Sequence, residues 1–197
     1  MSLREKKAVK KKEEILKSAV EIMAGKGYHA VTVEEVASRL LMTKGSVYYY
    51  FNDKEDLLYQ SIRMLMEQTI DKIRSVLEEE ITIVEKLKKA IVQHTISIIS
   101  ERSGFSISIR LEQIFTGRYL EELIQLREEY SEDFDTLLEK GMEEGLFIST
   151  NVKVVRNLIF GAMNGVVQWY SQEGEMDKKE FAEMIANHLL RLILKSK

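Results

Sequence analysis

The sequence predicts an all-α protein, with an N-terminal three-helix head followed by a helical body and about nine helices in total. Three observations lead to this prediction. The 197 residues include no proline, the residue that breaks helix interiors. Apolar residues recur at helical spacing in most segments, and glycines or capping residues separate those segments. The chain is also 45% hydrophobic, which is enough for a substantial core.

The first predicted helix of the head is preceded by a strongly basic segment. Residues 1–12 carry six basic residues against one acid, and they form either a disordered arm or the fraying start of the helix. The basic residues are Arg4, Lys6, Lys7, Lys10, Lys11 and Lys12. The apolar face of the helix then follows i, i+4, i+7 and i+8 spacing, at Ile15, Ala19, Ile22 and Met23. Gly25 and Gly27 are expected to end this helix.

A second predicted helix runs from Thr32 to about Leu40, and a third begins after Thr43 and ends near Phe51. Thr32 and Glu35 have the spacing of a capping box, and Thr43 is a natural N-cap. The apolar side chains of the second helix share one face: Val33, Val36, Ala37 and Leu40. In the third helix, Val47 and Phe51 lie one turn apart and are expected to dock it on the first two.

The outward face of the third predicted helix is unusual for a solvated helix, where Glu and Lys would dominate. It carries only glycine, serine and tyrosine, at Gly45, Ser46, Tyr48, Tyr49 and Tyr50. Glycine permits close approach, hydroxyl groups donate to phosphate oxygens, and aromatic rings contact thymine methyl groups or sugars. Lys44 and Lys54 bracket the helix with positive charge. The alternative is that the tyrosines pack between helices, and for Tyr50 that alternative is serious.

The charge distribution favours a polyanion bound at one end of the chain. Residues 1–54 hold 11 Lys/Arg and 7 Asp/Glu, a net charge of +4, whereas residues 55–197 have a net charge of −7. Chance and solvated helix faces are the competing explanation for this asymmetry.

Together, these features resemble the DNA-binding signature of the TetR family of bacterial transcriptional repressors. The segment Thr43-Lys-Gly-Ser-Val-Tyr-Tyr-Tyr-Phe51 is similar to the family's recognition helix, and Asn52-Asp-Lys-Glu-Asp-Leu57 to the start of its fourth helix. The resemblance implies a homodimer that binds a palindromic double-stranded DNA operator through a helix-turn-helix. The DNA contacts that it implies are Thr32, Val33, Thr43, Lys44, Gly45, Ser46, Tyr48, Tyr49, Tyr50 and Lys54.

One position departs from the family pattern. The turn between the two helices of the motif usually carries Gly-Val, and here it is Leu41-Met42. If Leu41 adopts the left-handed conformation of such turns, the strain is roughly 1–2 kcal/mol.

The body is expected to follow as residues 55–197, a ligand-binding and dimerisation domain after a DNA-binding domain of residues 1–54. A long fourth helix begins at the cap Asp53 and ends at about Glu79. Five more helices are predicted over about 82–101, 104–116, 118–144, 152–172 and 177–195, with Asn151 and Asp177 as caps of the last two.

The helix at 152–172 is apolar on two sides, as is the last helix, which suggests a core on one side and a second subunit on the other. One stripe holds Val155, Ile159, Ala162, Val166 and Trp169, and the other holds Phe160, Met163, Val167 and Tyr170. The last two helices together resemble the four-helix dimer interface of the family. A monomeric helical bundle is the alternative.

Polar residues among apolar ones in the body suggest a pocket for a hydrophobic effector, either acyl-CoA-like or a lipophilic drug-like compound. The candidate ligand-binding residues are Phe105, Arg110, Gln113, Phe160, Met163, Asn164, Gln168 and Trp169. The alternative is that these polar groups pair with one another and with the helix ends. Two other functions stay open: a DNA-binding regulator without a small-molecule effector, and a helical ligand-binding protein that uses the head differently.

Nothing in the sequence predicts an enzyme, a cofactor or a metal site. The three histidines are scattered, and neither a His-Glu-x-x-His nor a Gly-x-Ser-x-Gly motif occurs. There is no cysteine, and no apolar run approaches the ~20 residues of a membrane span. A cytoplasmic protein is expected.

Overall fold

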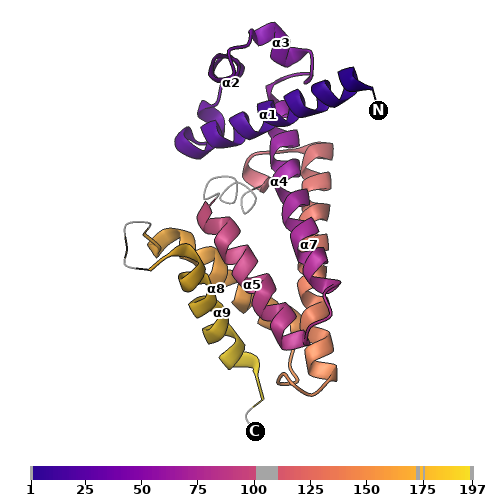
Figure 1. Ribbon diagram of the computed structural model, residues 1–197, viewed down its shortest axis with the longest axis vertical. Coiled ribbons are helices and arrows are strands. Elements are labelled where there is room, and N and C mark those ends of the chain that lie inside the picture. The colour runs from indigo at the N-terminus through magenta and orange to yellow at the C-terminus, as the bar shows by residue number, and fades with distance from the viewer. Residues whose placement is uncertain (1, 101–110, 172–173, 175, 196–197) are drawn as a thin grey trace. The chain divides into compact units, whose positions relative to one another are not determined.

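The computed structural model describes residues 2–100, 111–171, 174 and 176–195. Within them the chain is almost entirely helical (Figure 1). The helices are α1 (Leu3–Lys26), α2 (Val33–Arg39), α3 (Lys44–Tyr48), α4 (Lys54–Leu77), α5 (Ile83–Ser100), α7 (Gly117–Glu143), α8 (Val152–Trp169) and α9 (Lys178–Ile193). Short 3-10 turns cover Tyr28–Ala30 and Leu111–Gln113. The all-α prediction is confirmed, although most of the helix expected over 104–116 lies outside the described residues.

The chain forms two compact units. The first contains the described residues of 1–67 and 103–124, and the second those of 68–102 and 125–197. Helices α4 and α7 each begin in the first unit and end in the second.

The basic N-terminal segment is helical from Leu3, so it is neither a disordered arm nor a frayed end. A capping box fixes its first turn: Ser2 Oγ accepts from the Glu5 backbone N–H (3.2 Å), and Glu5 Oε2 accepts from the Ser2 N–H (3.1 Å). The helix ends at Gly27, which has a φ of +80°.

The core of the first unit is built from the apolar faces predicted for the first three helices. Ile15 and Ala19 of α1 and Val36 of α2 are fully buried. Val47 of α3 and Phe51 just after it are buried as well, which confirms them as the pair that docks α3. In Figure 1, α2 and α3 lie on the same side of α1.

The turn between α2 and α3 is a Schellman motif. The Leu41 N–H donates to the Ser38 carbonyl (3.1 Å), and the Met42 N–H donates to the Ala37 carbonyl (2.9 Å). Leu41 has a φ of +53°, so it does adopt the left-handed conformation. The motif's usual turn geometry is therefore retained without the glycine that would normally supply it. Helix α3 is also shorter than predicted, since it ends at Tyr48 and not near Phe51.

In the second unit, α5 packs against α8 and α9. One buried cluster joins the three helices. It is formed by Ile99 of α5, Val166 of α8, Tyr170 just after α8, and Phe181 of α9. The chain after α9 is held by two backbone hydrogen bonds, from the Ile148 N–H to the Ile193 carbonyl (2.8 Å) and from the Lys195 N–H to the Leu146 carbonyl (3.0 Å).

Candidate functional sites

Helix α3 is held at its start by a side-chain cap. Thr43 Oγ1 accepts a hydrogen bond from the Ser46 backbone N–H (3.1 Å) and lies 2.8 Å from Ser46 Oγ. With Val47 buried on the inner side, the residues on the opposite side face solvent. The exposed members of the predicted DNA-contact set are Thr32, Thr43, Lys44, Gly45, Tyr48 and Tyr49, and Ser46, Tyr50 and Lys54 are half-buried.

The protein's own packing does not require glycine at position 45. A Cβ placed there would meet only Thr43 Oγ1, at 3.9 Å, which is an ordinary van der Waals contact. Its φ is not in the left-handed region, and alanine is about 1 kcal/mol better than glycine inside a helix. The open space above Gly45 is therefore consistent with close approach by another molecule.

The three tyrosines differ in exposure. Tyr49 is 78% exposed and Tyr48 is 39% exposed, whereas Tyr50 is half-buried. The rings of Tyr49 and Tyr50 meet edge to face, with centroids 5.1 Å apart. Tyr50 thus packs against its neighbours on one side and is partly exposed to solvent on the other. The sequence left its role open between packing and DNA contact.

Both lysines that bracket α3 already have partners. Lys44 Nζ lies 2.5 Å from Glu34 Oε1, and this hydrogen bond raises the pKa of Lys44. Lys54 Nζ donates to the His29 carbonyl (3.1 Å). A phosphate group would have to compete with Glu34 for Lys44.

Two residues of the second helix behave differently from the expectation. Val33 is only 3% exposed, so its side chain belongs to the core and cannot reach a ligand. Thr32 Oγ1 accepts from the Glu35 N–H (3.2 Å), but the Glu35 carboxylate forms an ion pair with Lys26 (2.6 Å). Of the two hydrogen bonds of the predicted capping box, the one accepted by the Thr32 side chain is present, whereas the Glu35 side chain pairs with Lys26 instead of the Thr32 backbone.

The described members of the predicted effector set differ in exposure and belong to different units. Phe105 and Arg110 lie outside the described residues. Gln113 is exposed in the first unit, and Gln168 and Trp169 are exposed on α8, with Trp169 at 60%. The other three, Phe160, Met163 and Asn164, are buried or half-buried in the second unit.

Asn164 and Phe160 meet a polar and aromatic group that the sequence did not reveal. His94 of α5 is 5% exposed, with its Nε2 3.2 Å from Asn164 Oδ1 and its Nδ1 2.5 Å from the Tyr130 hydroxyl of α7. The His94 ring stacks on Phe160 with an interplanar angle of 6°. These partners are 36 and 70 residues away from His94 in the chain, so no local motif could have predicted them.

The hydrogen bonds indicate which tautomer the neutral His94 ring adopts. Asn164 Oδ1 can only accept, so Nε2 carries the proton, and Nδ1 accepts from the Tyr130 hydroxyl. Burial lowers the pKa of His94 to about 4, and the hydrogen bond to Asn164 offsets this in part. Burial also raises the pKa of Tyr130. Both groups are therefore neutral near pH 7.

An apolar stripe of α8 faces solvent, together with part of α9. Val154, Leu158 and Trp169 are 55%, 68% and 60% exposed, and Leu192 of α9 is 70% exposed. This exposure corrects one predicted stripe. Its members Val155, Ile159 and Val166 are buried, but Ala162 and Trp169, which were grouped with them, are exposed.

Two further searches of the described residues gave negative results. They include no group of three or more His, Cys, Asp or Glu side chains arranged to hold a metal ion. No helix among them is long and apolar enough to cross a bilayer.

Comparison with known proteins matches most of the chain to two protein-family models. Residues 15–60 match "Bacterial regulatory proteins, tetR family", and residues 80–193 match "Tetracyclin repressor-like, C-terminal domain". A curated relative from Bacillus subtilis, "Fatty acid metabolism regulator protein", is 27% identical over 183 residues, covering 92% of each chain.

Solved structures agree with these matches. The regulator FadR from Bacillus subtilis, solved in complex with stearoyl-CoA, is 26% identical, with a TM-score of 0.73 over 90% of this chain and 97% of its own. The fatty acid degradation regulator FadR from Bacillus halodurans is 27% identical, with a TM-score of 0.74 over 91% of this chain and 94% of its own.

Proposed function

The chain belongs to the TetR family of bacterial regulatory proteins, and from that premise we propose that it is a dimeric repressor that a hydrophobic effector releases from operator DNA. The observation that carries the DNA-binding part is α3, a capped helix that exposes glycine and tyrosines beside a docked valine. We assign residues 1–54 to DNA binding and residues 55–197 to effector binding and dimerisation. We place the protein and its DNA target in the cytoplasm.

The chemistry of α3 supports a major-groove role. In a helix-turn-helix, the N-terminal residues of the second helix contact base edges, and hydroxyl or lysine side chains contact phosphates. Here those positions hold Lys44, Gly45 and Ser46. The rings of Tyr48 and Tyr49 lie open to solvent next to them, available to sugars or thymine methyl groups.

Substitution of Gly45 by alanine tests this role with the least disturbance to the fold. Because the site is open, Gly45→Ala should leave the protein as stable as the wild type or slightly more stable. Because the new methyl group stands between α3 and the DNA, binding to duplexes that the wild-type protein selects from a random pool should weaken at least tenfold.

Gly25→Ala is the matched control, since Gly25 is another helical glycine of the first unit with nothing within 4 Å of a new Cβ. Like Gly45→Ala, it should be as stable as the wild type or slightly more stable, but it should leave binding unchanged. If the Gly45→Ala protein binds the selected duplexes as tightly as the Gly25→Ala protein, α3 is not the recognition helix.

The exposed stripe of α8 supports dimerisation. Four large apolar side chains exposed on α8 and α9 are unusual on a monomer surface, and the same face of a second copy would cover them. Two copies of α3 would then reach two half-sites of a palindromic operator.

The effector assignment rests on the second unit and on one relative. FadR from Bacillus subtilis has been solved with stearoyl-CoA, and its structure matches 90% of the length of this chain. In this chain, His94 stacks on Phe160 and is joined to Asn164, and Met163 lies buried on the same helix. An apolar lining with a few convergent polar groups suits a long acyl chain with a polar head.

Titration of the protein bound to a selected duplex with stearoyl-CoA tests this assignment, with free CoA and a lipophilic cation as comparisons. Release of the DNA by stearoyl-CoA and not by free CoA is expected. Release by the cation alone would point to a drug-like effector, and no release by any of the three would favour a regulator without a small-molecule effector.

A further inference from the structure

We propose that the first three turns of α1 form a second DNA-binding element, which contacts the phosphate backbone beside the segment that α3 reads. This inference rests on the proposed DNA-binding function. It concerns Arg4, Lys6, Lys7 and Lys10, which are not among the residues that the helix-turn-helix resemblance implies.

The positive charge of the head comes entirely from this segment. Residues 1–12 hold six basic residues and one acid, whereas residues 13–54 hold five basic and six acidic residues. Residues 13–54, which include the helix-turn-helix, therefore carry a net charge of −1. Since phosphate neutralisation dominates the affinity of proteins for DNA, the motif needs cations from elsewhere in the chain.

Internal partners occupy most basic residues of residues 13–54. Three of the five form ion pairs, Lys26 with Glu35, Arg39 with Glu21 and Lys44 with Glu34. A fourth, Lys54, donates to a backbone carbonyl.

The first turns of α1 are different. Among the described residues no ion pair engages Arg4, Lys6, Lys7 or Lys10, all of which are exposed, and only Lys11 is paired, with Glu14 (2.8 Å). The one acid of the segment, Glu5, is used in the N-terminal capping box. The unpaired cations are thus concentrated on one helical segment, available for an external polyanion.

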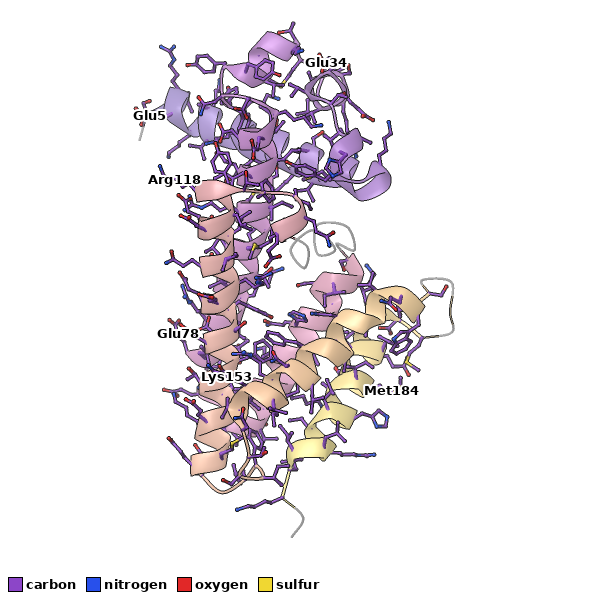
Figure 2. The ribbon with its side chains drawn as sticks, turned by 180° about the vertical axis from the view of Figure 1, so that it is seen from behind. Glu5, Glu34, Glu78, Arg118, Lys153 and Met184 are labelled. Carbon is purple, nitrogen blue, oxygen red and sulfur yellow. The ribbon has the colours of Figure 1, made fainter. Side chains whose placement is uncertain are left out.

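A direct contact places this segment beside the recognition helix. The Lys12 ammonium lies 5.5 Å from the ring centre of Phe51, the buried residue that follows α3. From Lys12 the helix continues toward its N-terminus for about 12 Å to Arg4, at 1.5 Å per residue. That length corresponds to roughly three base pairs of duplex rise. In the view of Figure 2, α3 lies between Glu34 of α2 and Glu5 of α1.

The capping box stabilises the helical conformation of the segment from its first turn. Helical geometry from Leu3 onward holds Lys6 and Lys10 one turn apart on one side, and Arg4, Lys7 and Lys11 along another. The cations are therefore already arranged in rows before a polyanion binds, whereas a flexible arm would lose conformational entropy on binding. A lipid surface is the other polyanion that a basic helix can bind, and Leu3 and Val9 are exposed. Because the segment belongs to the same compact unit as the helix-turn-helix, DNA is the favoured partner.

The test compares the variant Lys6→Gln/Lys7→Gln/Lys10→Gln with the wild type in binding to one fixed random-sequence duplex over a series of salt concentrations. The matched control is Lys72→Gln/Lys140→Gln/Lys195→Gln, which removes the same charge from exposed lysines of the second unit. Lysine and glutamine have similar helix propensities, and circular dichroism verifies that α1 stays folded.

We expect the slope of log affinity against log salt to fall by about 0.9 for each phosphate contact removed, or by about 2–3 per protomer, in the α1 variant alone. The affinity ratio between a selected and a random duplex should stay unchanged, because phosphate contacts carry no sequence information. An equal slope in the α1 variant and the control would overturn the inference and leave the role of α3 standing.

Two further outcomes would also decide the matter. If the wild type binds vesicles containing phosphatidylserine, and the α1 variant loses that binding with no change in the salt slope on DNA, the segment is a membrane element. If the wild type binds no duplex even at low salt, the proposed function fails, and this inference with it.

Discussion

At the residue scale, Leu41 shows how a sequence can depart from a motif without changing its geometry. The Schellman turn needs a left-handed residue after α2, and Leu41 takes that conformation with a φ of +53°. Its side chain is 97% exposed, so no packing is gained in return. The two hydrogen bonds of the turn and the docking of Val47 hold the strained residue in place.

Leu41→Gly should therefore stabilise the protein. Relief of the left-handed strain, roughly 1–2 kcal/mol, exceeds the entropy cost of glycine, and we expect a net gain of about 0.5–1 kcal/mol in the free energy of unfolding. Urea midpoints measure this gain. Leu40→Gly is the control, because Leu40 has a φ of −99° and should lose stability. A Leu41→Gly protein that unfolds at lower urea would contradict the strain argument.

His94 should make stability depend on pH. Its folded-state pKa of about 4 lies below the ordinary value of 6.5, so the unfolded chain binds more protons between these values. The contribution is fully present above about pH 6.5 and is lost as the pH falls toward 4, by roughly 2–4 kcal/mol in all. Urea unfolding at neutral pH and near pH 4.5 measures the loss.

The comparison protein for this prediction is His94→Gln, which keeps a polar side chain without a titrating group. It should be less stable than the wild type at neutral pH and lose less stability on acidification. Equal acid sensitivity in the two proteins would mean that other groups dominate.

At the element scale, the end of α7 depends on one close approach. A Cβ on Gly141 would lie 2.1 Å from two ring carbons of Phe147, which is fully buried. The Gly141 carbonyl also accepts from the N–H groups of Leu146 and Phe147. The glycine thus lets the chain fold back over the helix, and the returning segment bonds the chain after α9 through Ile148.

Gly141→Ala should destabilise the second unit, even though alanine is the better helix former. The methyl group forces Phe147 out of its position, and overpacking of this kind costs about 1–3 kcal/mol. Thermal melting measures the effect, with Gly25→Ala as the control in an open site. A Gly141→Ala protein as stable as the control would show that Phe147 moves aside at little cost.

At the scale of the whole molecule, the exposed apolar features that the proposed dimer would cover lie on α8 and α9. The exposed stripe contains Leu158, and the protomer's own core does not use it. A helix that is apolar on two opposite sides needs two partners, and within one protomer α8 has only one covered side.

Leu158→Glu should convert a dimer into a monomer without unfolding the protomer, because the side chain is 68% exposed before assembly. Sedimentation at micromolar concentration measures the mass, and affinity for a selected duplex should fall with loss of the dimer. Ser75→Glu, which adds the same charge on an exposed face of α4, should leave the mass unchanged. A wild-type monomer would end the dimer proposal. Leu189, although apolar, is unsuitable for this test, since it is only 6% exposed within the protomer.

The sequence by itself determined the helical class, the three-helix head and most helix starts. These depend on local signals that act within one or two turns: the caps Thr43, Asn151 and Asp177 each accept from backbone N–H groups a few residues ahead. The docking pair Val47 and Phe51 followed from the same short spacing. Local signals also located the odd Leu41 turn, because its neighbours fix its geometry.

Only the tertiary structure decided which apolar faces are covered and which polar groups meet. Periodicity identifies the faces of α8, but the packing of α5 against one of them determines that Val155 is inside and Trp169 outside. The bond between His94 and Asn164 joins residues 70 positions apart, and the pairing of Lys44 with Glu34 joins two different helices. Such contacts follow from the arrangement of whole helices in space, and no short stretch of sequence carries that information.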